Sequence, residues 1–94
     1  MATHELKTWP EHFDLVWCGV KRFEVRKDDR GFALHDVLVL REWSYEEGYS
    51  GRWVTGVVTS KLDGGQFGIE PGYCVLGFAP LSEGNERATK EAGR

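Results

Sequence analysis

Residues 18–30, which read CGVKRFEVRKDDR, join the end of a short predicted helix to a charged strand. Side chains on a strand point alternately to its two faces, so Phe23 and Val25 should share one face. Three charged side chains then occupy the other face: Arg22, Glu24 and Arg26. We expect the apolar pair to anchor a core and the ionic side chains to line a surface or a cleft.

Charge is unevenly distributed along the chain. Residues 21–30 hold five basic and three acidic residues, a local charge of +2, whereas the net charge of all 94 residues is −3. The mild acidity argues against a protein that coats nucleic acid through bulk charge. It leaves room for a local basic groove around residues 21–30.

Length and composition indicate one globular domain. A chain of 94 residues, 40% of them hydrophobic, is long enough for one core and too short for two. No apolar run approaches the roughly 18 residues of a membrane span, and the N-terminal residues do not resemble a signal peptide. We therefore expect a cytoplasmic protein with no membrane association. Cys18 and Cys74 are expected to be buried apolar residues rather than a disulfide.

The histidines and cysteines show no metal-ligand spacing such as Cys-x-x-Cys or His-x-x-x-His. No Ser/His/Asp or Cys/His spacing indicates an activated nucleophile either. The sequence therefore predicts neither a metal nor a cofactor.

A short strand over residues 4–8, with Leu6 inward, is predicted to precede the helix, which should span about ten residues. Thr8 and Glu11 have the spacing of a capping box, and Pro10 suits the first helical turn. Four apolar residues follow at helical spacing and should form the buried face: Phe13, Val16, Trp17 and Val20. Gly19 is expected to end the helix in a left-handed conformation.

Short strands separated by turn signals follow the helix. They are predicted at residues 22–27, 37–43, 52–62 and 73–78, with loops at 46–51 and 63–72. This order indicates an α+β, mainly β fold: a small, partly closed antiparallel barrel with one N-terminal helix packed at its end. We assign residues 1–81 to this domain. Residues 82–94 offer little to bury and are predicted to be a disordered tail.

The order of these elements resembles the ASCH domains of the PUA-like superfamily. The resemblance rests on Gly19-x-Lys21-x-x-Glu24-x-Arg26, followed by an apolar strand that His35-Asp36 introduces. Three further segments are similar to a small ASCH-related family of bacteria and phages that has no settled function: residues 6–11, 41–43 and 72–77. The resemblance covers residues 4–79.

The resemblance implies a PUA-like barrel with a cleft, lined by residues 21–26, that holds RNA or a nucleotide. Some ASCH relatives are hydrolases: one type deacylates acetylated cytidine nucleosides, and others are reported as ribonucleases. Lys21 matches the lysine of the deacylase type, but Glu24 stands where its threonine nucleophile would be. The helical insertion that carries the distant glutamate of that type is missing. Glu24 could still act as a general base in hydrolysis.

Lys21, Glu24 and Arg26 are the leading candidates for a ligand site. Arginine and lysine suit a phosphate, and the carboxylate suits the amino group of a base. The structural alternative is a surface ion-pair ladder. The other candidates are a basic rim, one tryptophan and two side chains of the glycine-rich loop: Arg22, Lys27, Arg30, Trp9, Gln66 and Phe67. Solvated charge, core packing and plain turn geometry are the structural alternatives for these.

Three functions from different classes fit this sequence. The first is an RNA- or nucleotide-binding module that holds a single strand or a single base between residues 21–26 and the glycine-rich loop. The second is a metal-independent hydrolase of RNA or a modified nucleoside, with Glu24 as general base and Lys21 stabilising the developing anion. The third is a protein-interaction accessory factor with a surface around four residues: Tyr45, Glu46, Glu47 and Tyr49.

Overall fold

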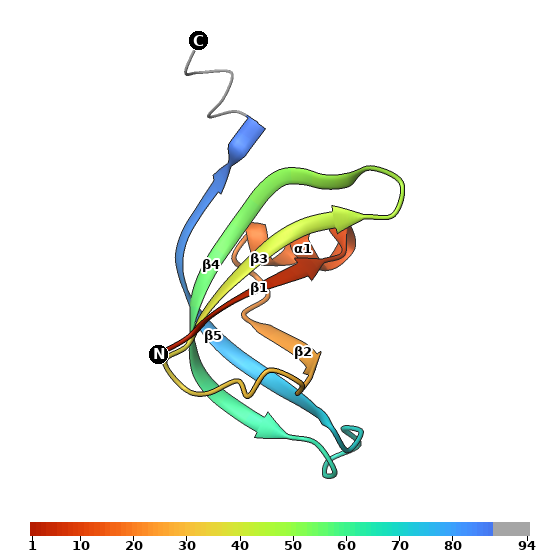
Figure 1. Ribbon diagram of the computed structural model, residues 1–94, viewed down its shortest axis with the longest axis vertical. Coiled ribbons are helices and arrows are strands. Elements are labelled where there is room, and N and C mark those ends of the chain that lie inside the picture. The colour runs from red at the N-terminus through yellow and green to blue at the C-terminus, as the bar shows by residue number, and fades with distance from the viewer. Residues whose placement is uncertain (88–94) are drawn as a thin grey trace.

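The computed structural model describes residues 1–87 (Figure 1). Its elements are, in chain order, β1 (Thr3–Thr8), α1 (Pro10–Trp17), β2 (Phe23–Lys27), β3 (Val37–Ser44), β4 (Gly48–Asp63) and β5 (Tyr73–Asn85). The expectation of a mainly β fold with one early helix is confirmed over this part of the chain.

The strands form a five-stranded sheet in the order β1-β3-β4-β5-β2. Neighbouring strands are antiparallel except β1 and β3, which run parallel, so the sheet is mixed and the expectation of an antiparallel barrel is wrong in this detail. The sheet curls into a half-barrel whose two edge strands are β1 and β2, and α1 packs against β3 (Figure 1). The barrel is therefore open between β1 and β2.

The two longest strands, β4 and β5, carry much of the curl. Their pairing register shifts between Thr55 and Gly56 and again between Val58 and Ser60, and such bulges bend a strand and increase its twist. Gly56 lies at the first shift, where a Cβ atom would stand 2.5 Å from Cδ2 of Phe78. Only glycine fits there without displacing the Phe78 ring, so the bend and the core packing depend on the same residue.

The hydrophobic core lies between α1 and the sheet. Its members come from the helix, from four strands and from the segment before β3: Leu6, Phe13, Val16, Phe32, Leu38, Leu40, Val54, Val58, Cys74, Leu76 and Phe78. Each large apolar side chain buried in this way stabilises the fold by about 1.5–3 kcal/mol. Among the described strands, β2 alone contributes no apolar side chain to this core.

The helix begins and ends differently from the prediction. Trp9 is the N-cap residue and no side chain caps the helix, so the predicted capping box of Thr8 and Glu11 is wrong. Thr8 instead belongs to β1, where it is buried. The helix ends at Trp17, and Gly19 has the expected left-handed conformation, with φ of 78°. Val20 follows this turn and is exposed, so it does not extend the buried face of the helix.

Strand β5 is longer than the sequence indicates. The predicted strand ends at residue 78, but pairing with β4 continues to Arg52 and Asn85. Gly84 lies in this extension, directly against the Trp53 ring. Residues 82–85, expected in a tail, are therefore part of the sheet. Glu86 and Arg87 follow the strand and are exposed, and residues 88–94 of the expected tail lie outside the described residues.

The two cysteines differ in burial, and neither forms a disulfide. Cys74 is fully buried in the core, as expected, and burial raises the pKa of its thiol. Cys18 is exposed, because it is the C-cap residue of α1, where the chain turns away from the core. The expectation of a buried residue is wrong for Cys18.

Candidate functional site

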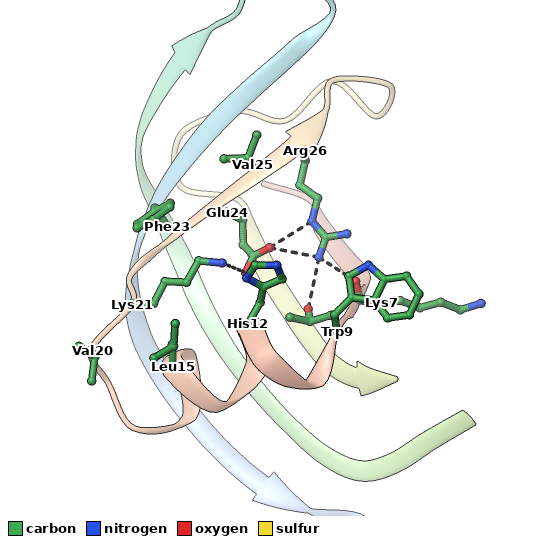
Figure 2. Close-up of a pocket in the computed structure, with 11 residues that line it drawn as sticks. Lys7, Trp9, His12, Leu15, Val20, Lys21, Phe23, Glu24, Val25 and Arg26 are labelled. Atoms are coloured by element: carbon green, nitrogen blue, oxygen red, sulfur yellow. Dashed lines mark hydrogen bonds and ion pairs between the residues drawn. The ribbon is translucent and has the colours of Figure 1, made fainter. Parts of the chain in front are cut away.

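A cavity of about 610 Å³ opens beside the half-barrel's edge strand β2. Its walls are the C-terminal end of β1, one side of α1, and β2 with the turn before it (Figure 2). The lining residues all fall within one short stretch of chain: Lys7, Thr8, Trp9, His12, Leu15, Val20, Lys21, Phe23, Glu24, Val25 and Arg26. We call this cavity the β2 pocket.

A buried carboxylate between two cations forms the polar part of the β2 pocket. The Glu24 side chain is only 5% exposed. Arg26 donates a hydrogen bond from Nε to Glu24 Oε2 at 3.2 Å, and Lys21 Nζ lies 3.7 Å from Glu24 Oε1 (Figure 2). Lys21, Glu24 and Arg26 therefore do meet at one site, and the cluster carries a net charge of +1.

The two oxygens of Glu24 have different surroundings. Oε2 accepts the hydrogen bond from Arg26. Oε1 is buried, and no described residue donates a hydrogen bond to it; the Lys21 ammonium forms an ion pair with it at a distance too long for one. A buried acceptor without a donor costs about 1–3 kcal/mol, more when it is charged. Because Glu24 lines the β2 pocket, an N–H or O–H group of a ligand could donate to Oε1 once the side chains that cover this oxygen move.

Arg26 also bridges the open side of the half-barrel. Its Nη2 donates to the carbonyl oxygen of Lys7 at 2.8 Å and to Oγ1 of Thr8 at 3.3 Å, both on the opposite edge strand β1. Arg30 Nη1 donates in the same way to the carbonyl oxygen of Glu5 at 2.8 Å. These guanidinium groups replace the backbone hydrogen bonds that would close a full barrel, so part of each arginine is committed to the fold.

The two faces of β2 are exchanged relative to the sequence-based expectation. Phe23 and Val25 are 48% and 54% exposed, whereas Glu24 is buried. The prediction that this apolar pair anchors the core is wrong, although the alternation of faces holds. Because β2 is an edge strand, its inward side meets carbonyl and hydroxyl groups of β1, which need a donor such as Arg26 rather than a methyl group. Phe23 and Val25 instead line the β2 pocket.

Trp9 forms an aromatic wall of the β2 pocket. It is the N-cap residue of α1, and 43% of its surface is exposed. Trp9 therefore lines this cavity and is not fully packed into the core. His12 and Leu15, one helical turn further on, line the same cavity from α1 (Figure 2). Sequence reasoning missed both, although their i, i+3 spacing places them on one face of the helix.

The remaining predicted site residues lie outside the β2 pocket. Gln66 and Phe67 belong to the loop between β4 and β5, which lies at the far end of the sheet from α1 (Figure 1). Lys27 is exposed and does not line the cavity, and neither does Arg22, whose Nε donates to the carbonyl oxygen of Gly19. The pocket therefore forms between β2 and α1, and not between β2 and the glycine-rich loop.

Arg52 of β4 holds α1 in the position that forms this pocket. Its guanidinium donates from Nε to Glu42 Oε1 at 2.9 Å and from Nη2 to Glu42 Oε2 at 2.8 Å. It also donates to Asp14 of the helix, and it lies 5.1 Å from the ring centroids of Phe13 and Trp17. These hydrogen bonds hold the pKa of Glu42 below its usual range and raise the pKa of Arg52.

No helix within residues 1–87 is long and apolar enough to cross a membrane. No three side chains of histidine, cysteine, aspartate or glutamate in that range gather in a way that could hold a metal ion.

A profile of DUF3850, a domain of unknown function, matches residues 3–78. The chain belongs to the DUF3850 family. The matched segment contains every residue of the β2 pocket and ends before the last part of β5.

One protein of Escherichia phage P2, named "Uncharacterized 12.9 kDa protein in GpA 3'region", is 42% identical to this DUF3850 chain over 60 residues. The aligned part is 64% of this chain and 54% of the phage protein, so the chain spans about half the length of that relative. Neither name states an activity.

Proposed function

We propose that this DUF3850 chain binds RNA or a nucleotide and holds one nucleobase in the β2 pocket. The single observation that carries the proposal is Glu24 Oε1, a buried carboxylate oxygen at a cavity with no donor among the described residues. Every nucleobase has an amino or imino N–H group that such an oxygen can accept. A hydrogen bond to a charged acceptor typically contributes about 1.5–3 kcal/mol.

The walls of the pocket suit a flat, partly apolar ring. Trp9 and Phe23 offer exposed aromatic surface, and stacking of a base on such a ring contributes about 1–3 kcal/mol. A cavity of about 610 Å³ lies within the range of small-molecule sites, roughly 300–1,000 Å³. Shape and surface therefore favour a base over a purely ionic ligand.

Cations at the pocket suit the phosphate of the same ligand. Lys21 and Lys7 both line the cavity, and Arg26 is held there by its bonds to Glu24 and β1. Together they supply more positive charge than Glu24 neutralises. A single-stranded ligand is favoured over a duplex because only an unpaired base can enter a small pocket.

The resemblance to ASCH domains adds a second line of support. A curled half-barrel with an N-terminal helix is compatible with a PUA-like barrel, and the Lys21–Arg26 segment lies at the cavity as that resemblance implies. We therefore extend the proposal to the fold family: this DUF3850 chain is a PUA-like module of the ASCH type.

Calorimetric titration with the four ribonucleoside monophosphates tests the proposal. We expect saturable binding by at least one of them, and Glu24→Gln should weaken it by about tenfold to a hundredfold because a neutral amide is a poorer acceptor. Glu70→Gln, which removes the same charge from an exposed position in the loop before β5, is the matched control and should change nothing. Equal affinity of wild type and Glu24→Gln would overturn the proposal.

Hydrolysis is a second candidate, favoured by the same oxygen. Glu24 Oε1 would take a proton from water as the water oxygen attacks a carbonyl or phosphoryl group. Lys21, 3.7 Å away, would stabilise the developing anion, and Glu24 would return the proton to the leaving group. Product analysis of the titration mixtures decides between the candidates: turnover that Glu24→Gln abolishes supports hydrolysis, and turnover that survives the substitution excludes this mechanism.

A further inference from the structure

A second cavity, of about 400 Å³, lies next to the β2 pocket. It is lined by Lys7, Trp9, Trp43 and Tyr45. Lys7 and Trp9 line both cavities, so the two adjoin at these side chains. We call this second cavity the aromatic platform.

Three aromatic rings that line the platform contact one another. The Trp9 centroid lies 5.7 Å from that of Trp43 and 5.2 Å from that of Tyr45, and the Trp43 and Tyr45 rings meet edge to face at 4.7 Å. Lys7 Nζ lies 4.4 Å from the Trp43 ring centroid. Tyr45 nevertheless remains 79% exposed. The cluster thus presents open aromatic surface beside a cation.

We propose that the aromatic platform is a second base subsite, so that the ligand is a single strand of at least two nucleotides. This inference rests on the proposed function, because the first base occupies the β2 pocket. The second base stacks on the exposed ring of Tyr45. Trp9 separates the two bases, and Lys7, which lines both cavities, meets the phosphate that joins them.

Acidic residues next to the aromatic platform limit how many nucleotides it can bind. Glu46 and Glu47 follow Tyr45 in the turn between β3 and β4, and both are exposed. Their charges repel a phosphate that would continue along the turn. The subsite therefore takes one base, and a dinucleotide contains the full recognition element.

Calorimetric comparison of a mononucleotide with the matching dinucleotide and tetranucleotide tests this inference. We expect the dinucleotide to bind at least tenfold more tightly than the mononucleotide, and the tetranucleotide to gain little more. Tyr45→Ala should weaken dinucleotide binding by about fivefold to a hundredfold and leave mononucleotide binding unchanged. Tyr45→Phe should retain most of the affinity because the ring remains. Phe67→Ala, which removes a similarly exposed ring that lines neither cavity, is the control.

The possible failures are distinguishable. If the mononucleotide binds through Glu24 but the dinucleotide binds no better, or Tyr45→Ala affects neither ligand, the platform inference is overturned and the proposed function stands. If no nucleotide binds to wild type, both fall. A protein partner that binds wild type and is lost with Tyr45→Ala, with no effect of the substitution on dinucleotide binding, would assign the platform to a protein surface and overturn the inference.

Discussion

The two carboxylate oxygens of Glu24 differ in their partners. Oε2 accepts a hydrogen bond from Arg26, which in turn donates to Lys7 and Thr8 of β1. Oε1 has only the distant ammonium of Lys21. A residue selected for stability alone would have both oxygens paired, because an unpaired buried acceptor is destabilising. The arrangement is typical of a site where stability is given up for binding.

Asp36 is the clearest pH-sensitive group among the described residues. It accepts hydrogen bonds from the backbone amides of Ala2 and Ala33 and pairs with His4 at 2.8 Å. The pKa of Asp36 is lowered from 3.8 to about 2. The hydrogen bond from the Ala2 amide is the largest cause of this shift, and the hydrogen bond with His4 is the next. The carboxylate thereby ties the start of β1 to the start of β3.

We expect the stability of the protein to fall as pH drops from about 3.8 to about 2. Because the folded-state pKa is the lower one, the unfolded chain binds a proton more readily in this range, and acid favours unfolding. Above pH 3.8 the contribution of Asp36 is fully present. Urea unfolding at several pH values should show this loss for wild type and a flatter profile for Asp36→Asn. Equal profiles would contradict the role of Asp36.

The residue types of the site could be predicted from the sequence, but not their orientation. Lys21, Glu24 and Arg26 were identified as one cluster because of their spacing on a strand. Hydrophobicity then placed Phe23 and Val25 in the core, which is wrong because an edge strand can bury a carboxylate when the opposite edge supplies polar groups. Nothing in the local sequence says which strand will be an edge.

Arg52 connects helix α1 to strands β3 and β4. The guanidinium fork binds both oxygens of Glu42 and also reaches Asp14. The side chain of Glu42 is 11% exposed, so its charge needs this partner. A substitution that breaks the contacts of Arg52 with Glu42 and Asp14 should also make the wall of the β2 pocket that α1 forms less rigid.

Arg52→Lys should destabilise the protein by about 1–2 kcal/mol, because a lysine ammonium cannot reproduce the two-point contact with Glu42. Chemical denaturation monitored by tryptophan fluorescence measures this. Asp14→Asn serves as the control: Asp14 is 61% exposed, and its loss should change the free energy of unfolding by less than about 0.5 kcal/mol. Equal stability of Arg52→Lys and wild type would show that the two-point contact with Glu42 does not stabilise the fold.

The end of β5 supplies a test of the strand extension. If Gly84 were replaced by any other residue, its Cβ atom would lie 2.5 Å from Cζ2 of Trp53, so the substitution must displace that ring. We expect Gly84→Val to destabilise the protein by about 1–3 kcal/mol, as overpacking does. Thermal unfolding measures the change. A substitution without effect would show that residues 82–85 form the tail that the sequence indicates.

The sequence predicts the existence and type of the helix and strands better than it predicts where they begin and end. The helix and each described strand overlap a predicted range, and Gly19 follows the helix in the expected conformation. The loop predicted at residues 46–51 is wrong in part, because β4 already begins at Gly48. The boundaries failed where tertiary contacts override local signals. Thr8 resembles a helix cap but is held in β1, with its hydroxyl bonded to Arg26, and residues 82–85 resemble a tail but pair with β4.

Residues 1–87 form a half-barrel, and the proposed binding pocket lies at its open side. β1 and β2 are the free edges of the sheet, and Arg26 and Arg30 join them by hydrogen bonds to the carbonyl oxygens of Lys7 and Glu5. The β2 pocket lies beside this seam. The parallel pairing of β1 with β3 and the separation of the glycine-rich loop from the pocket are long-range properties, which periodicity along the chain cannot report.

The four tryptophans permit a direct test of the central claim, that the β2 pocket holds a nucleobase. Trp9 lines this pocket, whereas Trp17 packs against the core and Trp53 contacts Gly84 on β5. Titration of the protein with a nucleoside monophosphate, followed through the four indole N–H signals by NMR, reports on each position separately. We expect the Trp9 signal to shift saturably while those of Trp17 and Trp53 stay in place. Shifts confined to Trp53, or no shift of Trp9 at saturating ligand, would contradict the claim.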